Sequence, residues 1–187
     1  QEKFYRIPYC SLDLQGDLLG RKINFLHLDL RADNFYLPGS LILDFDTITD
    51  PFMELRLSSN EMELATLKTL LPDPLINDWT TRTIFPRLEN GTARITDFVL
   101  AGTLDEIGKL GEPEHSHCLS WAGILHNVDT FYNDHKPLAR VHSAHLSMDG
   151  DLLKITELRG ESGKSTLTGG NLAISCLYNP ISILTAD

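Results

Sequence analysis

Long apolar runs are absent from this 187-residue sequence, and cysteine is scarce. No stretch approaches the roughly 18–20 consecutive apolar residues that a helix needs to cross a bilayer. The three cysteines, Cys10, Cys118 and Cys176, are far apart and allow at most one disulfide bridge within the chain. The sequence therefore predicts neither a membrane-spanning helix nor a fold held together by disulfides.

Basic residues are also few, since 16 Lys and Arg face 26 Asp and Glu and the formal net charge is −10. A protein that binds nucleic acid needs basic side chains to neutralise phosphates, and no basic stripe is present. The same balance argues against adhesion to an anionic membrane surface. The composition is otherwise that of an ordinary folded protein, 42% hydrophobic and 22% charged, long enough for one domain with a sizeable core.

The chain begins at Gln1, without a basic segment followed by an apolar one. We therefore expect a processed product or a piece of a longer protein.

Alternation of apolar and polar residues is the main structural signal. It recurs over 26–30, 41–45, 53–57, 144–148 and 172–176. Such alternation is typical of antiparallel strands with one buried face. Turn signals lie between these runs at Pro38-Gly39, Asp50-Pro51, Asn90-Gly91 and Asp149-Gly150, and the last two are strong hairpin signals. The sequence predicts a mainly β protein.

One region has helical spacing instead. Apolar residues between Asn60 and Leu71 recur every three or four positions, Asn60 with Glu63 suits a helix start, and Pro72 ends the helix. Asp73-Pro74 predicts a second short helix through about Thr81. We expect one β-rich unit over 1–187, with leading strands over 1–58, a helical interruption over 60–81 and further strands over 88–184.

The strongest candidate for metal chemistry is the histidine pair His115 and His117. On a strand the two imidazoles would point to one face and could share a metal, which would suit a metal-dependent enzyme. No recurrent fourth-ligand spacing supports that reading, and no catalytic constellation is present elsewhere. The expectation from the residues is therefore no enzyme, no metal and no cofactor.

Residues 70–174 resemble the AsmA-like superfamily of bacterial envelope proteins, nearest the DUF3971/YhdP branch, with TamB a more distant relative. The elements that carry the likeness come in family order: Leu71-Pro72-Asp73-Pro74-Leu75-Ile76-Asn77-Asp78-Trp79, Leu88-Glu89-Asn90-Gly91-Thr92-Ala93-Arg94-Ile95, Leu100-Ala101-Gly102-Thr103-Leu104, Trp121-Ala122-Gly123-Ile124-Leu125-His126-Asn127-Val128, Lys136-Pro137-Leu138, and 144–163. The loop from Glu112 to His117 has no counterpart in the family.

This resemblance implies a non-enzymatic, periplasmic segment of a longer protein, anchored in the inner membrane by a helix absent from this chain. It implies an antiparallel curved sheet that forms a groove or half-open barrel and takes part in phospholipid transport between the inner and outer membranes. The expected partners are phospholipid acyl chains, adjacent β-groove segments of the same longer protein and an envelope protein. The alternative is an assembly module that binds an envelope protein through a sheet edge.

The alternation also predicts which side chains would line such a groove. They are Leu26, Leu28, Leu30, Leu41, Leu43, Phe45, Leu55, Leu57, Leu146, Met148 and Ile174. The same residues would equally suit a closed core under the helices.

Overall fold

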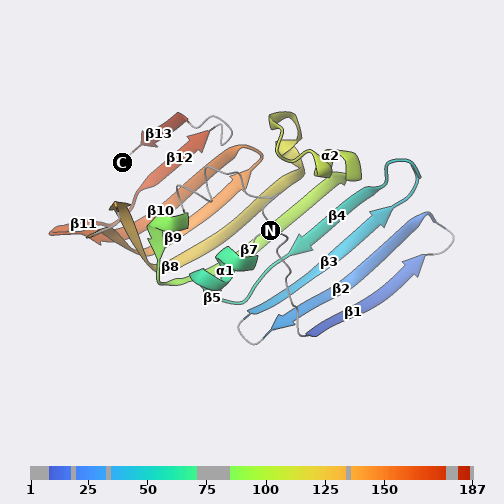
Figure 1. Ribbon diagram of the computed structural model, residues 1–187, viewed down its shortest axis with the longest axis horizontal. Coiled ribbons are helices and arrows are strands. Elements are labelled where there is room, and N and C mark those ends of the chain that lie inside the picture. The colour runs from blue at the N-terminus through green and yellow to red at the C-terminus, as the bar shows by residue number, and fades with distance from the viewer. Residues whose placement is uncertain are drawn as a thin grey trace.

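The protein, seen in a computed structural model, is described over residues 9–17, 20–32, 35–70, 85–133, 136–175 and 181–185. These residues form one antiparallel sheet, drawn in Figure 1. In order across the sheet, its main strands are β1 (Tyr9–Asp17), β2 (Lys22–Ala32), β3 (Phe35–Asp44), β4 (Phe52–Leu57), β7 (Thr92–Thr103), β8 (Leu119–Asn133), β9 (Lys136–Asp149), β10 (Leu152–Ser162), β12 (Asn171–Ser175) and β13 (Ile181–Thr185).

Three short strands pair with these long ones. They are β5 (Met62–Glu63) on β7, β6 (Leu88–Glu89) on β8 and β11 (Ser165–Leu167) on β10. The sheet is not closed into a barrel, because β1 and β13 pair with each other nowhere in the described ranges. The mainly β, antiparallel prediction is confirmed.

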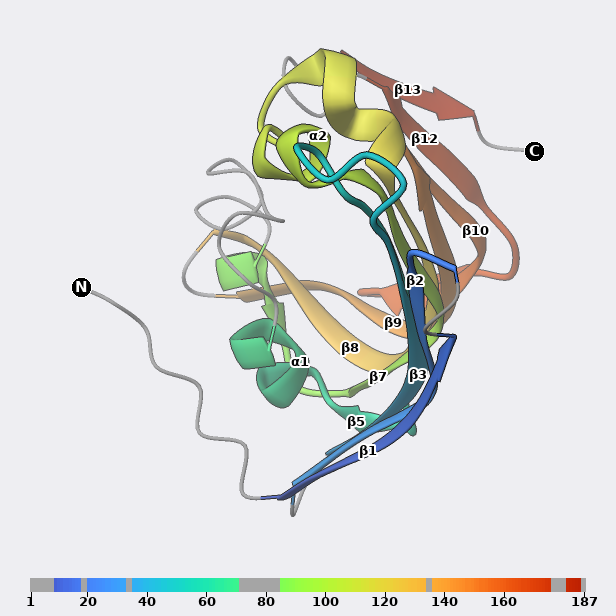
Figure 2. The ribbon, with the colours of Figure 1, turned by 90° about the vertical axis from the view of Figure 1, so that its right-hand side faces the viewer.

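The sheet is curved, and its helices lie on the concave side, which we call the inner face (Figure 2). The helices are α1 (Leu64–Leu70), α2 (Leu104–Gly108) and the 3₁₀ helices η3 (Phe85–Arg87) and η4 (Pro113–Cys118). Because α1 comes shortly before β7 and α2 directly after it, the two lie at opposite ends of that strand. No helix within the described ranges has the length and apolar character needed to cross a membrane.

Two separate hydrophobic clusters hold the helices to the inner face. Leu110, just after α2, and Cys118 of η4 pack with Phe98, Leu100 and Leu119 of β7 and β8. Under α1, a second cluster joins residues of the helix, β7 and β8: Leu64, Ala93 and Val128. The core is thus divided between the two ends of the strands.

Mid-strand irregularities explain how one sheet carries both clusters. The register shifts in β2 between Phe25 and Leu28, and in β7 between Ile95 and Asp97. Asn127 in β8 and Glu157 in β10 adopt left-handed backbone conformations, with φ of 53° and 52°. Such bulges bend a strand and increase its local twist, so they contribute to the curvature seen in Figure 2.

Close backbone approach at these irregularities requires glycine. A Cβ on Gly39 of β3, which pairs with Leu28 just after the β2 bulge, would lie 2.2 Å from the Arg56 carbonyl oxygen. A Cβ on Gly123, which pairs with Ile95 at the β7 bulge, would lie 2.8 Å from the Arg94 carbonyl oxygen. Any side chain at either position would push neighbouring strands apart.

Of the predicted turns, Asp149-Gly150 is confirmed as the β9–β10 hairpin and Asp50-Pro51 lies between β3 and β4. Pro38-Gly39 was wrong as a turn, because it lies inside β3. Asn90-Gly91 was wrong as a hairpin, because the strands on both sides of it, β6 and β7, pair with β8 in one register. It interrupts a strand instead of reversing it.

The helix predicted from Asn60 to Leu71 is shorter in the structure, since it begins at Leu64 and is preceded by β5. Asn60 does not cap it: the Asn60 side-chain oxygen accepts from the Tyr36 backbone N–H at 2.7 Å. The helix predicted over 73–81 lies outside the described residues. A helix that the alternation did not predict, α2, begins with a capping box between Thr103 and Glu106.

Candidate functional site

The candidate site is the inner face of the sheet, because strand register brings apolar residues from nearly every main strand to it. The β4 side chains that point to this face are identified by the cluster under α2, against which Met53, Leu55 and Leu57 pack. Leu43 and Leu41 pair with Met53 and Leu55, and therefore point the same way.

The same register argument extends across the sheet in both directions. Leu28 pairs with Gly39, which pairs with Leu57, and Leu30 follows by alternation. In the other half, Met148 packs in the cluster under α2 and Leu146 follows it by alternation. Ile174 pairs with Leu153, which pairs with Met148.

Two predicted groove residues are placed differently. Leu26 lies in the β2 bulge, is 52% exposed, and lines a shallow hollow together with Ser40 and Arg56. These two alternate with inner-face residues, so the hollow belongs to the outer face. Phe45 lies just beyond the end of β3, half-buried, where its backbone N–H donates to the Arg21 carbonyl oxygen at 2.7 Å.

Only part of the apolar inner face is buried beneath helices. Residues of β2 and β3 on this face, including Leu28, Leu30, Leu41 and Leu43, are half-buried and belong to neither hydrophobic cluster. Leu146, Leu153 and Ile155 are likewise half-buried on the other side of the clusters. The inner face is therefore apolar well beyond the area that the described helices cover.

The inner face is bordered by α1 at one end of the strands, held by a lysine. Lys68 Nζ donates to the carbonyl oxygens of Phe85, at 2.6 Å, and Leu88, and it lies 6.0 Å from the centre of the Phe85 ring. Partial burial lowers the pKa of Lys68. These contacts tie α1 to η3 and leave the ammonium no evident chemical role beyond that.

The Asp129 carboxylate is a buried, hydrogen-bonded polar group of the sheet. It accepts from Arg140 Nε at 2.8 Å and from Asn90 Nδ2 at 2.9 Å. The hydrogen bond from Arg140, followed by that from Asn90, lowers the pKa of Asp129. Asp129 follows inner-facing Val128, so this network belongs to the outer face and links β8, β9 and the β6–β7 junction.

The structure does not bring the predicted histidine pair together. His115 and His117 lie on η4, where residues two apart point to different sides. His117 Nε2 lies 3.9 Å from Glu106 Oε1 and 3.7 Å from Cys118 Sγ, while His115 Nε2 lies 3.9 Å from Glu112 Oε2. Across the described ranges, no three His, Cys, Asp or Glu side chains gather in a way that could hold a metal ion.

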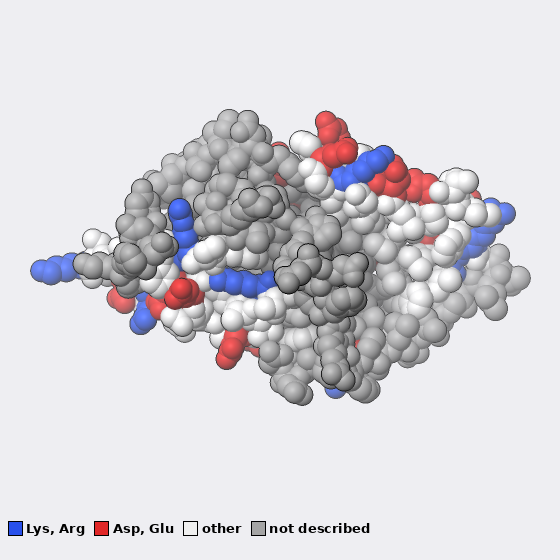
Figure 3. Space-filling view, viewed as in Figure 1, with Lys and Arg blue, Asp and Glu red and all other residues white. Residues whose placement is uncertain are grey.

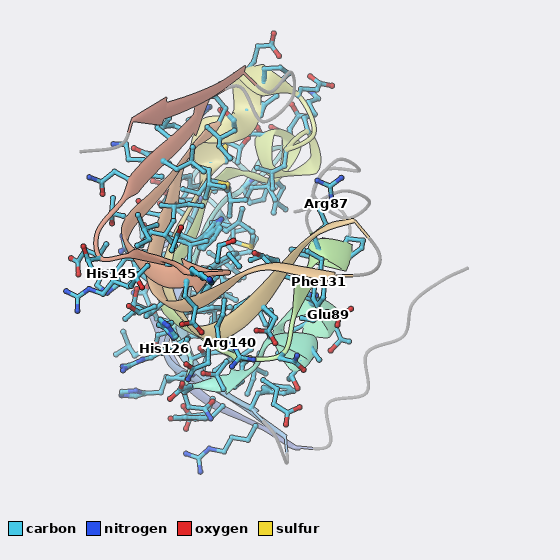
Figure 4. All side chains as sticks on the ribbon, turned by 90° about the vertical axis from the view of Figure 1, so that its left-hand side faces the viewer. Arg87, Glu89, His126, Phe131, Arg140 and His145 are labelled. Atoms are coloured by element: carbon cyan, nitrogen blue, oxygen red, sulfur yellow. The ribbon has the colours of Figure 1, made fainter. Side chains whose placement is uncertain are left out.

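Among the described residues, Cys118 and the pair of His145 with Glu157 lack the features of a reactive centre. Cys118 is only 2% exposed, and burial raises the pKa of its thiol, which disfavours the nucleophilic thiolate. His145 lies on the outer side of the sheet, as Figure 4 shows, 3.8 Å from Glu157. The chemistry that the arrangement best supports is non-directional contact with apolar groups.

No family model, curated protein or solved structure matches the chain. The resemblance to the AsmA-like superfamily that the sequence suggests stays a prediction.

Proposed function

We propose that the inner face binds phospholipid acyl chains, and that the protein is a non-enzymatic, periplasmic segment of a longer, membrane-anchored protein that takes part in phospholipid transport. One observation carries the proposal: the apolar inner face extends past both hydrophobic clusters, over β2 and β3 on one side and over β9 and β10 on the other. In this proposal the curved sheet acts as a groove.

An acyl chain that moves from a bilayer to this face stays in apolar surroundings, which favours transport. Each CH₂ group exposed to water costs about 0.8 kcal/mol, and a chain that moves from bilayer to apolar sheet avoids that cost. Side chains such as Leu30, Leu41 and Leu146 offer no directional hydrogen bonds. Binding by such a surface is weakly selective, which suits a conduit that must also release its ligand.

Photo-crosslinking tests this proposal directly. A benzophenone side chain is placed at Leu41 or Leu146 on the inner face, and at Ser40 or Ser147, the adjacent outward positions, as matched controls. The protein is then irradiated in cells and its adducts are identified by mass spectrometry. We expect phospholipid adducts at Leu41 and Leu146 and few at the controls. Equal lipid yields at inner and outer positions would rule out binding by the inner face.

A second candidate function is assembly through the sheet edges, which a specific observation favours. β13 (Ile181–Thr185) contains no charged residue and no Pro, and the nine-residue β1 (Tyr9–Asp17) contains no Lys, Arg or Pro and carries charge only at Asp13 and Asp17. Exposed edge strands usually carry charged side chains, above all Lys, or Pro, because these residues prevent pairing with other chains. Adjacent segments of the same protein, or an envelope protein, would pair there.

Native mass spectrometry distinguishes the two functions. A complex with a protein partner and no lipid would favour assembly, whereas co-purified phospholipid without a partner would favour the lipid-binding function.

A further inference from the structure

Three exposed apolar side chains lie on adjoining segments at the end of the sheet that carries α2. They are Ile48, Phe52 and Leu104, which are 70%, 39% and 49% exposed. We call these three residues the shoulder patch. Scattered exposed apolar residues are normal, but several on adjoining, ordered segments mark interaction sites.

The segments that carry the shoulder patch are joined to each other by hydrogen bonds. The Leu104 N–H donates to the Pro51 carbonyl oxygen at 3.0 Å, and the Asp105 N–H donates to Asp50 Oδ1 at 3.1 Å. Phe52 pairs with Thr103 in the ladder between β4 and β7. The capping box of α2 fixes the same corner. A partner would therefore meet a preformed surface, which reduces the entropy cost of binding.

None of the shoulder-patch residues is among the inner-face residues that carry the proposed lipid binding. Phe52 is adjacent to Met53, which packs on the inner face under α2, so Phe52 points outward. None of the three patch residues belongs to either hydrophobic cluster. The patch can therefore be altered without changing a residue of the proposed lipid-binding face.

The segments that meet at this end of the sheet carry an excess of acidic residues. Segments 20–22, 44–52 and 103–118, which meet at this end, carry seven acidic residues and three basic ones. The acidic ones are Asp44, Asp46, Asp50, Asp105, Glu106, Glu112 and Glu114. Two of the basic residues are already paired, Lys22 with Asp44 at 2.7 Å and Lys109 with Asp105 at 2.6 Å. Figure 3 shows acidic groups gathered along this edge of the molecule.

We propose that the shoulder patch docks a basic segment of a partner protein, one in which Lys or Arg flank aliphatic or aromatic anchors. Apolar side chains of the partner would contact Ile48, Phe52 and Leu104, while its cations face the surrounding carboxylates. Charge complementarity selects this occupant, because acidic surroundings repel an anionic membrane surface and an acidic protein alike. Buried apolar anchors supply the affinity, and the charges mainly set the choice of partner.

The test uses the full protein in cells, with a photo-crosslinking residue at Ile48, whose high exposure makes replacement harmless to the fold. A matched control carries the crosslinker at Leu167 on β11, which is 41% exposed and away from α2. Adducts are mapped by mass spectrometry to the partner's crosslinked segment. We expect a protein adduct at Ile48, absent at Leu167, whose crosslinked segment has a net positive charge.

The charge requirement is tested with Asp46→Asn and Asp105→Asn combined in the Ile48 crosslinker protein. We expect the yield of the adduct to fall about two- to tenfold, as is usual when exposed charges at the rim of an interface are removed. An unchanged thermal midpoint would show that the fold is intact. A lipid adduct at Ile48, a neutral or acidic partner segment, no adduct, or an unchanged yield in the double variant would each overturn the proposal.

Discussion

Gly39 offers the sharpest test of how the sheet is bent. A Cβ at this position would lie 2.2 Å from the Arg56 carbonyl oxygen and 2.6 Å from Leu57 Cδ2, whereas real Cβ contacts are essentially never below 3.0 Å. For Gly39→Ala, β3 and β4 must therefore move apart by about 0.8 Å where they pair. Overpacking of this kind typically costs about 1–3 kcal/mol.

The measurement is urea unfolding, followed by circular dichroism. With a slope of about 1–3 kcal/mol per molar urea, the midpoint of Gly39→Ala should fall by about 1 M. In thermal unfolding the expected decrease is about 2–4 °C for each kcal/mol in a chain of this size. Hydrogen exchange should speed up at the paired amides of β3 and β4 before it changes in β9 or β10, because the clash is local.

Gly111→Ala is the matched control, since a Cβ at Gly111 would meet nothing within 4 Å and the residue is exposed. Its stability should stay within about 0.5 kcal/mol of the wild type. If Gly39→Ala unfolds at the same urea concentration as Gly111→Ala, the close approach of β3 and β4 is not a requirement of the fold, and the reasoning fails.

Three further predictions concern single polar groups. The pKa of Asp129 is lowered in the folded protein, so its stabilising contribution is present above about pH 4 and is lost as the pH falls through the folded-state value. Arg140→Gln should therefore destabilise the protein more at pH 7 than at pH 2, as measured by urea unfolding at both pH values. Lys68→Met leaves the carbonyl oxygens of Phe85 and Leu88 without this donor and should cost about 1–3 kcal/mol in the same assay, while Lys68→Arg should recover part of the loss. Cys118, with the other two cysteines replaced by serine, should react with a maleimide at least about 100-fold more slowly in the native protein than in urea; rapid native labelling would contradict its burial.

Local pattern predicts strands well wherever the ladder is regular. In β4 and β9 the apolar residues predicted to share one face do so, and in β3 so do Leu41 and Leu43, because these residues lie within stretches of constant register. The Asp149-Gly150 hairpin also follows from turn chemistry alone. Most of the candidate site was therefore within reach of the sequence.

Turn chemistry fails at Asn90-Gly91 because long-range pairing decides the outcome. Leu88, Glu89 and Thr92 all pair with β8, and the Asn90 side chain donates to Asp129 across the sheet. The left-handed conformations of Asn90 and Gly91 that would make a hairpin serve here to interrupt a strand. No local signal separates the two uses. For the missed helix α2, in contrast, the sequence does contain a local signal, because Thr103-x-x-Glu106 is a capping box.

Leu26 was misplaced because strict alternation cannot describe a strand that contains a bulge. A bulge adds one residue to a strand, so an apolar residue that keeps to the inner face must shift by one position. Phe25 and Leu28 are three apart, as are Ile95 and Phe98, and each pair straddles a register shift. Apolar residues at i and i+3 within a strand are thus the sequence trace of a bulge, and a glycine on the neighbouring strand, Gly39 or Gly123, accompanies each one. Without the added residue, the apolar side chains in half of each strand would point to the outer face. The added residues therefore keep the inner face apolar at both ends of the strands. The curvature and the continuity of the apolar face therefore have the same cause.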